Sequence, residues 1–166
     1  MAWSNVGVGP VQLNPAGYGR TLTITSGNAD KGFPSGNLIR NNLFRSDSGT
    51  ALWIQATGGG NQFVRDVFWS AGSTRVRASV SGGTTPDSFE HVTFYYSAAG
   101  ASLVIDTLTQ PGLALHDSIV SYSGTNLFEF DHTPELAAYS GDYNVFFNRS
   151  GSVAFAGIGE LAAFRA

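Results

Sequence analysis

Residues 38–44 read LIRNNLF, in which two apolar ends flank a doubled asparagine, a residue type that β-strands disfavour. Related stretches follow along the chain: RDVF at 65–68, HVTF at 91–94, DSIV at 117–120 and YNVF at 143–146. Their last residues are 24 or 26 positions apart, so the chain contains an internal repeat. These last residues are Phe44, Phe68, Phe94, Val120 and Phe146.

Other columns keep step with this one. One column lies five residues earlier, and two apolar columns lie about eight and ten residues later, with a variable residue between them. This apolar–variable–apolar alternation is typical of a strand that buries one face. The earlier column contains Ile39, Phe63, Phe89, Leu115 and Gly141. The two later apolar columns contain Leu52, Val76, Leu103, Phe128 and Phe155, and then Ile54, Ala78, Ile105 and Phe130. The variable residues between these two columns are Trp53, Arg77, Val104, Glu129 and Ala154.

A period near 25 residues, with short strands and no helical pattern, predicts an all-β solenoid in which each repeat is one coil. Leucine-rich repeats have a similar period, but their L-x-x-L-x-L-x-x-N frame is absent here. A β-sandwich also has frequent turns, but it does not produce column-by-column similarity at one long period. Stacked coils pair their strands about 4.8 Å apart, so we expect like residues to form ladders through the core.

The doubled asparagine is then explained as a bend between two strands. Asn42 aligns with Asp66, Val92, Ser118 and Asn144, most of which are small and polar. Asparagine tolerates a left-handed backbone, and its amide can form hydrogen bonds along the stack. We therefore expect this column to form a tight corner of each coil.

The frame I-x-N-N-x-F, followed by a glycine and A-L-x-I, resembles the repeat of the right-handed parallel β-helix family, which includes pectate lyases, polygalacturonases, other polysaccharide lyases and phage tailspikes. The resemblance covers about residues 37–155, and GDYNVFFNRSGSVAF with GELAAFRA is similar to the last coil and closing helix of many such bacterial proteins. It implies a right-handed parallel β-helix (solenoid) of about five to six coils with a short C-terminal capping helix. The specific catalytic motifs of these families are absent.

We expect a single β-helix domain over residues 1–166. Its parts would be an irregular N-terminal cap or continuation at 1–20, coils at 21–157 and a C-terminal cap at 158–166, because open ends of a solenoid expose unpaired strand edges.

Composition excludes several classes of function. The net charge is −3 and Lys31 is the single lysine, so no basic stripe exists for nucleic acid. The absence of cysteine excludes disulfides and thiolate metal sites, and no apolar run reaches the ~18 residues of a membrane span. The first residues lack the pattern of a signal peptide, so either a leader has been removed or the chain belongs to a longer one. We expect a secreted or cell-surface bacterial protein, and a cytoplasmic location remains open.

Superposing the repeats gathers ionisable residues into two neighbouring columns. Two carboxylates beside a histidine can divide acid and base roles. The family resemblance implies that Arg65 or Arg40 would neutralise a uronate and that His91 or His116 would act as the base, whereas a hydrolase would rely on Asp117 and Asp142. The alternatives are solvated charges that relieve repulsion between coils and a Glu/His/Asp metal site, for which no spacing motif exists. The candidate catalytic residues are Glu90, His116, Asp142, Arg65, His91 and Asp117, and no metal or cofactor is predicted.

Aromatic residues form a second candidate site. The column after the phenylalanine ladder contains rings, others follow it directly, and one lies on the outward column of the next strand. An exposed row of rings can stack on sugars or form an oligomer interface, and the alternative is that the turns fold several rings over the core. The candidate substrate-binding residues are Trp53, Trp69, Tyr95, Tyr96 and Tyr122.

The loop EFDHTPELAAY at 129–139 is a third candidate, because loops often carry function. His132 with Asp131 and Glu135 can form a site there. We favour a short helical turn instead, capped by Thr133 with Pro134 at its first position.

Two hypotheses of function follow. The first is a carbohydrate-associated domain that binds a polysaccharide or other glycan, or acts as a lyase or hydrolase. The alternative is a structural or interaction module without catalysis, such as an adhesin, a surface or spike-like segment, or a solenoid that forms homo-oligomers. Five or six coils stack to only ~25 Å, which is short for a groove that holds several sugars.

Overall fold

Every regular element in the described part of the chain is a β-strand. The computed structural model of the protein describes residues 11–13, 20–25, 35–55, 58–72, 74–77, 85–99, 103–105, 113–123, 128–130 and 139–149. These residues form strands β1–β16 and contain no helix. The predicted all-β class is confirmed for this part, whereas the predicted capping helix at 158–166 lies outside the described residues.

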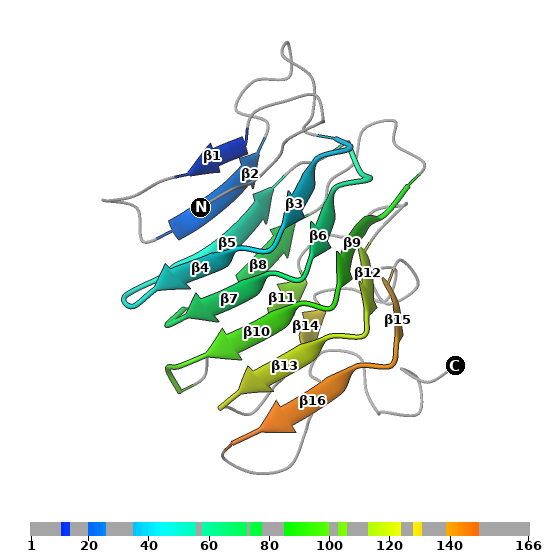
Figure 1. Cartoon of the computed structure of the whole chain (residues 1–166). Helices are drawn as coiled ribbons and strands as arrows, with labels where there is room; N and C mark the ends of the chain where they lie inside the picture. Colours follow the sequence, from blue (N-terminus) through cyan, green and yellow to red (C-terminus); the bar gives the residue numbers. More distant parts are fainter. Residues whose placement is uncertain are drawn as a thin grey trace.

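The strands form three sheets, and from β2 onward each sheet takes every third strand of the chain (Figure 1). Neighbouring strands are parallel, except that β1 pairs antiparallel with β2 at one edge. Sheet 1 consists of β3 (Leu38–Arg40), β6 (Gln62–Val64), β9 (Asp87–Glu90), β12 (Leu113–His116) and β15 (Tyr139–Asp142). Sheet 2 consists of β4 (Leu43–Ser46), β7 (Val67–Ser70), β10 (Thr93–Tyr96), β13 (Ile119–Tyr122) and β16 (Val145–Asn148). Sheet 3 consists of β1 (Val11–Leu13), β2 (Arg20–Thr25), β5 (Thr50–Gln55), β8 (Thr74–Arg77), β11 (Leu103–Ile105) and β14 (Phe128–Phe130).

From β3 onward, the chain passes through the three sheets in rotation. Each strand of sheet 1 leads through two residues into a strand of sheet 2, and sheet 3 lies behind sheet 2 in Figure 1. Parallel neighbours need a crossover connection, and here each crossover contains strands of the other two sheets. Within segment 1–20, for which the sequence predicts an irregular cap or continuation, residues 11–13 form β1.

Inward-facing side chains stack along the sheets. Phe44, Phe68 and Phe94 pair in register, and the ring centroids of successive neighbours are 5.2 Å apart. Phe63 stacks on Phe89 at 4.4 Å. All five rings are nearly inaccessible to solvent, which confirms the predicted ladders. The ladder of sheet 2 continues through the smaller Val120 to the partly buried Phe146.

Each bend between sheet 1 and sheet 2 consists of a left-handed residue followed by a residue whose side chain turns inward. The prediction that the column of Asn42 is left-handed is wrong by one residue, because the positive φ falls at Asn41. Asn42 instead follows the left-handed residue and leads into β4, and it is 5% exposed. The left-handed residues have φ between 48° and 58°, and they are Asn41, Arg65, His91, Asp117 and Tyr143.

The predicted hydrogen bonding along the stack is confirmed for the column of Asn42. Its backbone N and its Nδ2 both donate to Oδ1 of Asp66, at 2.8 and 3.0 Å. Val92 N donates to Oγ of Ser118, and Ser118 N donates to Oδ1 of Asn144, both at 3.0 Å. These bonds satisfy buried backbone donors at a corner where the sheet ladders are interrupted.

A second buried polar ladder lies where the chain enters sheet 1. Asn37 donates its backbone N and its Nδ2 to Oδ1 of Asn61, at 3.2 and 2.6 Å. Asn61 repeats the arrangement toward Oδ1 of Asp87, at 2.9 and 2.8 Å. All three side chains are at most 1% exposed, so this corner is held by side-chain hydrogen bonds rather than apolar packing.

The register of sheet 3 differs from the predicted one by two residues at β8. Val76 pairs with Ile54 and Ile105 rather than with Leu52 and Leu103, and Arg75 rather than Arg77 is the partner of Trp53. A slip of two residues leaves the same faces inward and outward. The alternation in the sequence therefore cannot distinguish the two registers.

Candidate functional site

The first column of predicted catalytic residues forms the ends of the sheet 1 strands. His116 at the end of β12 pairs in register with Glu90 on β9 and with Asp142 on β15. The predicted alignment of these three residues is therefore confirmed, and they stand about one strand spacing apart. Glu90 and Asp142 are exposed, and His116 is partly exposed.

The second column forms the left-handed residues of the bends. Arg65, His91 and Asp117 each follow a strand of sheet 1 directly, and their side chains are exposed. Their backbone N–H groups donate to carbonyls at the end of the neighbouring sheet 1 strand: Arg65 to Glu90 at 3.0 Å, His91 to His116 at 3.2 Å and Asp117 to Asp142 at 3.1 Å. The two columns together form one outer edge of the molecule, which we call the bend ridge. It consists of Arg40, Asn41, Val64, Arg65, Glu90, His91, His116, Asp117, Asp142 and Tyr143.

Close contacts between ionisable groups on the bend ridge are few. Nε2 of His91 lies 3.8 Å from Oε1 of Glu90, and both side chains are about half exposed. Asp142 uses Oδ1 to accept the backbone N–H of Tyr143 at 2.8 Å. Among the described residues, no group of three His, Cys, Asp or Glu side chains is arranged to hold a metal ion. The ridge therefore offers adjacent but solvated acid and base groups.

The charges along the bend ridge are arranged by sign. Arg40 ends β3 and Arg65 directly follows β6, whereas Asp117 directly follows β12 and Asp142 ends β15. Glu90, together with the two histidines, occupies the middle of the ridge. One end of the ridge is therefore basic and the other is acidic.

The predicted aromatic column lies on the outer face of sheet 2, where its members stack on one another. The Trp69 and Tyr95 rings are 4.3 Å apart with an interplanar angle of 35°. Cζ of Arg45 lies 5.4 Å from the Trp69 ring centroid, and Cζ of Arg149 lies 4.5 Å from the Tyr95 ring centroid. Each ring is flanked on both sides along the ladder, so neither offers an open face to a sugar.

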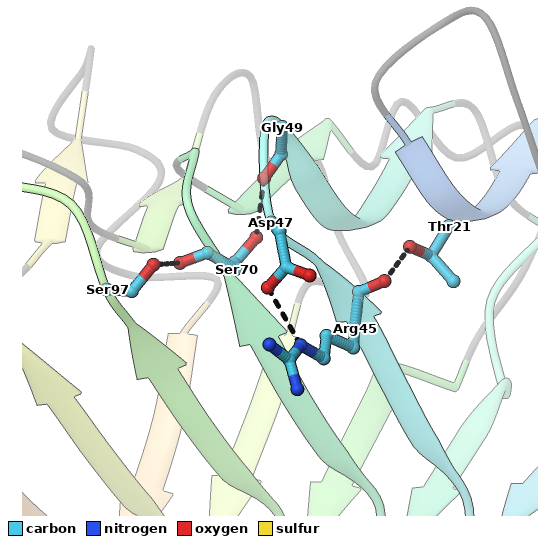
Figure 2. A network of polar contacts seen from close by, with 6 residues as sticks. All are labelled: Thr21, Arg45, Asp47, Gly49, Ser70 and Ser97. Atoms are coloured by element: carbon cyan, nitrogen blue, oxygen red, sulfur yellow. Dashed lines mark hydrogen bonds and ion pairs between the residues drawn. The ribbon is translucent and has the colours of Figure 1, made fainter.

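The cations at both ends of this aromatic ladder are held in place. Nε of Arg45 donates to Oδ1 of Asp47 at 2.7 Å, and Figure 2 shows this pair beside the bond from Thr21 to the Arg45 carbonyl. Figure 2 also shows the neighbouring chain of contacts from Ser97 through Ser70 to Gly49 at the turns that leave sheet 2. Arg149 donates to Oγ of Ser121 at 3.1 Å and to the carbonyl of Tyr96.

The prediction of an exposed row of rings is wrong for Tyr96 and Tyr122. Tyr96 and Tyr122 are 0% exposed, because alternate residues of a strand point to opposite faces and both follow an outward residue. Trp53 lies on β5 of sheet 3, so it does not share a face with Trp69 and Tyr95. Fully buried rings cannot stack on a ligand.

The sequence analysis missed an apolar stripe on the outer face of sheet 2. The signal was a break in alternation, since VFF at 145–147 and IV at 119–120 place apolar residues on both faces of a strand. Leu43, Ile119, Val145 and Phe147 are 54%, 46%, 57% and 56% exposed. Leu43, Ile119 and Val145 belong to one register column, which also contains Val67 and Thr93.

The loop candidates His132, Asp131 and Glu135, and the turn expected at Thr133 and Pro134, lie outside the described residues. Within the described ranges no helix is long and apolar enough to cross a membrane. Comparison of the chain with protein-family models, with curated proteins and with solved structures finds no match. The arguments on function therefore rest on the geometry of the bend ridge and of sheet 2.

Proposed function

We propose that the chain is a right-handed parallel β-helix that serves as a non-catalytic protein-interaction module, with the outer face of sheet 2 as its binding surface. The rotation of the chain through three parallel sheets, with ladders of like residues 24 or 26 positions apart, supports the β-helix. Crossovers between parallel strands are almost always right-handed, which supports the handedness.

The apolar stripe carries the proposal of an interaction module. Leu43, Ile119 and Val145 line one outward column, and Phe147 stands on the next outward column of β16. Exposed apolar side chains that are contiguous on a sheet, with polar residues around them, mark surfaces that bind protein. The flanked rings of Trp69 and Tyr95 argue against sugar stacking at the same face.

The test compares the wild type with Ile119→Ser/Val145→Ser, which changes two exposed side chains and leaves the core intact. Association is measured by sedimentation velocity of the purified chain and by co-purification from an extract with a tagged chain. We expect the double variant to lose the oligomer or the co-purified protein, whereas Ala98→Asp in the exposed turn after β10 keeps it. Identical behaviour of the double variant and the wild type in both measurements would overturn the proposal.

A second candidate function is glycan cleavage at the bend ridge, and the register of Glu90, His116 and Asp142 favours it. Acid and base groups on adjacent strands can divide proton transfer between them. A panel of acidic and neutral polysaccharides, assayed for unsaturated products and for reducing ends, tests this function. Cleavage that His116→Ala or His91→Ala abolishes would support it, and the absence of products from the whole panel would exclude it for those substrates.

A further inference from the structure

We propose that the partner of this surface is a second copy of the same chain, docked antiparallel along the bend ridge. The inference rests on the proposed interaction function and adds to it the identity and the orientation of the partner. The axis would be a two-fold that crosses the ridge at the coil of His91 and lies in the plane of the contact. Such an axis reverses the order of the coils and keeps each column opposite itself.

The charges of the bend ridge complement one another under this rotation. Arg65 lies one coil before His91 and Asp117 lies one coil after it, so Arg65 of one copy faces Asp117 of the other. Two coils from the centre, Arg40 faces Asp142 in the same way. By symmetry each pair forms twice. A parallel arrangement would instead place Arg against Arg and Asp against Asp.

The apolar column beside the ridge also matches itself under the same rotation. Leu43 of one copy faces Val145 of the other, and Val67 faces Ile119, with Thr93 at the axis. The three most exposed members of this column would thus be covered by apolar partners. The charge pattern and the apolar pattern are separate columns. The charges select the axis, and the apolar column is compatible with it.

At the axis, Glu90 and His91 meet the same residues of the second copy. Within one chain the His91 ring lies 3.8 Å from Glu90, so each of the two facing carboxylates has an imidazole of its own chain beside it. The exposed Tyr143 at the acidic end would reach Asn41 at the basic end of the second copy.

The size of the contact predicts how strong the association is. Five coils span four strand spacings, or about 19 Å, which places the interface at the small end of the range for protein contacts. We therefore expect a dimer whose population depends on concentration. Salt screens exposed ion pairs, with a Debye length of about 3 Å at 1 M. Added salt should therefore weaken a dimer held by ion pairs, whereas it would not weaken a contact made by apolar side chains alone.

The experiment is a charge exchange in the full chain, followed by sedimentation velocity over a concentration series at about 0.05 M and about 0.5 M NaCl. The variants are Arg65→Asp, Asp117→Arg and the combination of the two. We expect each single variant to raise the dissociation constant at least about tenfold at low salt, because like charges then face each other twice. The combination restores opposite charges across the axis, so its dissociation constant returns close to that of the wild type.

Two control variants carry charge changes of the same sign elsewhere. Ser48 and Ala98 lie in exposed turns at the far ends of the sheet 2 strands, and we expect wild-type association from Ser48→Arg and from Ala98→Asp. Circular dichroism of every variant checks the fold.

Other outcomes would overturn the inference. The inference is wrong if the single charge reversals leave the dimer unchanged, or if the combined variant does not regain association. In both cases the proposed interaction function survives. A chain that stays monomeric but retains another protein through Ile119 and Val145 also overturns the inference and keeps the function. A monomeric chain whose Ile119→Ser/Val145→Ser variant changes nothing overturns both.

Discussion

Asn42 donates its backbone N–H and its side-chain Nδ2 to the same oxygen, Oδ1 of Asp66, which lies 24 residues further along the chain. Both side chains are buried, and Oδ2 of Asp66 has no hydrogen-bond partner in the described part of the chain. Burial raises the pKa of the Asp66 carboxyl above its ordinary value, and hydrogen bonds from Asn42 and with the backbone of Val64 oppose this rise without cancelling it. The corner therefore holds a carboxylate that is costly to ionise.

The residues aligned with Asp66 in the ladder donate a hydrogen bond that an ionised Asp66 cannot donate. Asn42 donates Nδ2 to the carbonyl of Arg40 at 2.8 Å, and Ser118 donates Oγ to the carbonyl of His116 at 2.7 Å. In both cases the acceptor lies two residues earlier, which for Asp66 is the carbonyl of Val64, and an ionised carboxylate has no proton to donate to a carbonyl oxygen. A protonated carboxyl or the side-chain amide of an asparagine has a proton that it can donate.

Asp66→Asn should therefore increase the free energy of unfolding at pH 7 by about 1 kcal/mol, since an amide keeps the acceptor for Asn42 and adds a donor. In the wild type the folded pKa lies above the unfolded value near 3.8, so the stability from Asp66 is present below pH 3.8 and is lost as the pH rises through the raised value. The variant should lack this decline. Urea unfolding between about pH 3.5 and pH 7 measures both effects.

Asp117→Asn is the matched control, because Asp117 is exposed on the bend ridge. We expect it to leave the stability at pH 7 within about 0.5 kcal/mol of the wild type. A less stable Asp66→Asn at pH 7 would contradict the account of the ladder.

Asn61→Ala tests the second polar ladder. It removes the oxygen that accepts both donors of Asn37, and it leaves Asp87 without the Nδ2 donor of Asn61. Because these groups are buried, we expect a loss of about 3 kcal/mol in the free energy of unfolding. Gln62→Ala, one residue later and exposed, should change it by less than about 0.5 kcal/mol. Equal effects of the two substitutions, measured by urea unfolding, would show that the ladder does not hold this corner.

The columns were predictable because similar residues recur at the same place in successive repeats, whose strands pair in register. Phe44, Phe68 and Phe94 could be aligned from spacing alone, and so could Glu90 with His116. Spacing could not fix the register of Val76, since a slip of two residues preserves the inward face. It also could not locate the left-handed residue at Asn41, because either asparagine of the pair tolerates positive φ.

Exposure was harder to predict than alignment. Tyr95 and Tyr96 are adjacent in the sequence, yet one faces outward and the other is fully buried, and the choice depends on where the bend places the first residue of the strand. The two Arg contacts that flank Trp69 and Tyr95 come from Arg45 on β4 and from Arg149 just beyond β16, which lie 24 and 54 positions from the rings they contact. Contacts of that kind depend on side-chain reach, which no local pattern encodes.

The stacked pair Trp69 and Tyr95 should stabilise the fold as a unit. In a double-mutant cycle of Trp69→Ala and Tyr95→Ala, we expect a coupling energy of about 0.5–1.5 kcal/mol, because the rings lie 4.3 Å apart. The cycle is measured by urea unfolding. Pairing Trp69→Ala with Tyr143→Ala, at the exposed bend between β15 and β16, should instead give additive effects within about 0.5 kcal/mol. Additivity of Trp69 with Tyr95 would refute the ladder.

Substitutions at Tyr143 test whether the backbone of the bend is left-handed at this residue. It has φ of 52° and is 80% exposed, so its side chain contributes little packing that a substitution would remove. Left-handed backbone costs an ordinary residue about 1–2 kcal/mol, asparagine adopts it more readily, and a β-branched residue is strongly disfavoured there. We expect Tyr143→Asn to gain about 0.5–1 kcal/mol in the free energy of unfolding and Tyr143→Val to lose about 1–2 kcal/mol. At Val145, which is exposed on the extended β16, valine is already favoured, so Val145→Asn should destabilise the fold. Opposite preferences for Asn and Val two residues apart would place the bend at Tyr143, whereas the same preference at both positions would show that the backbone there is extended.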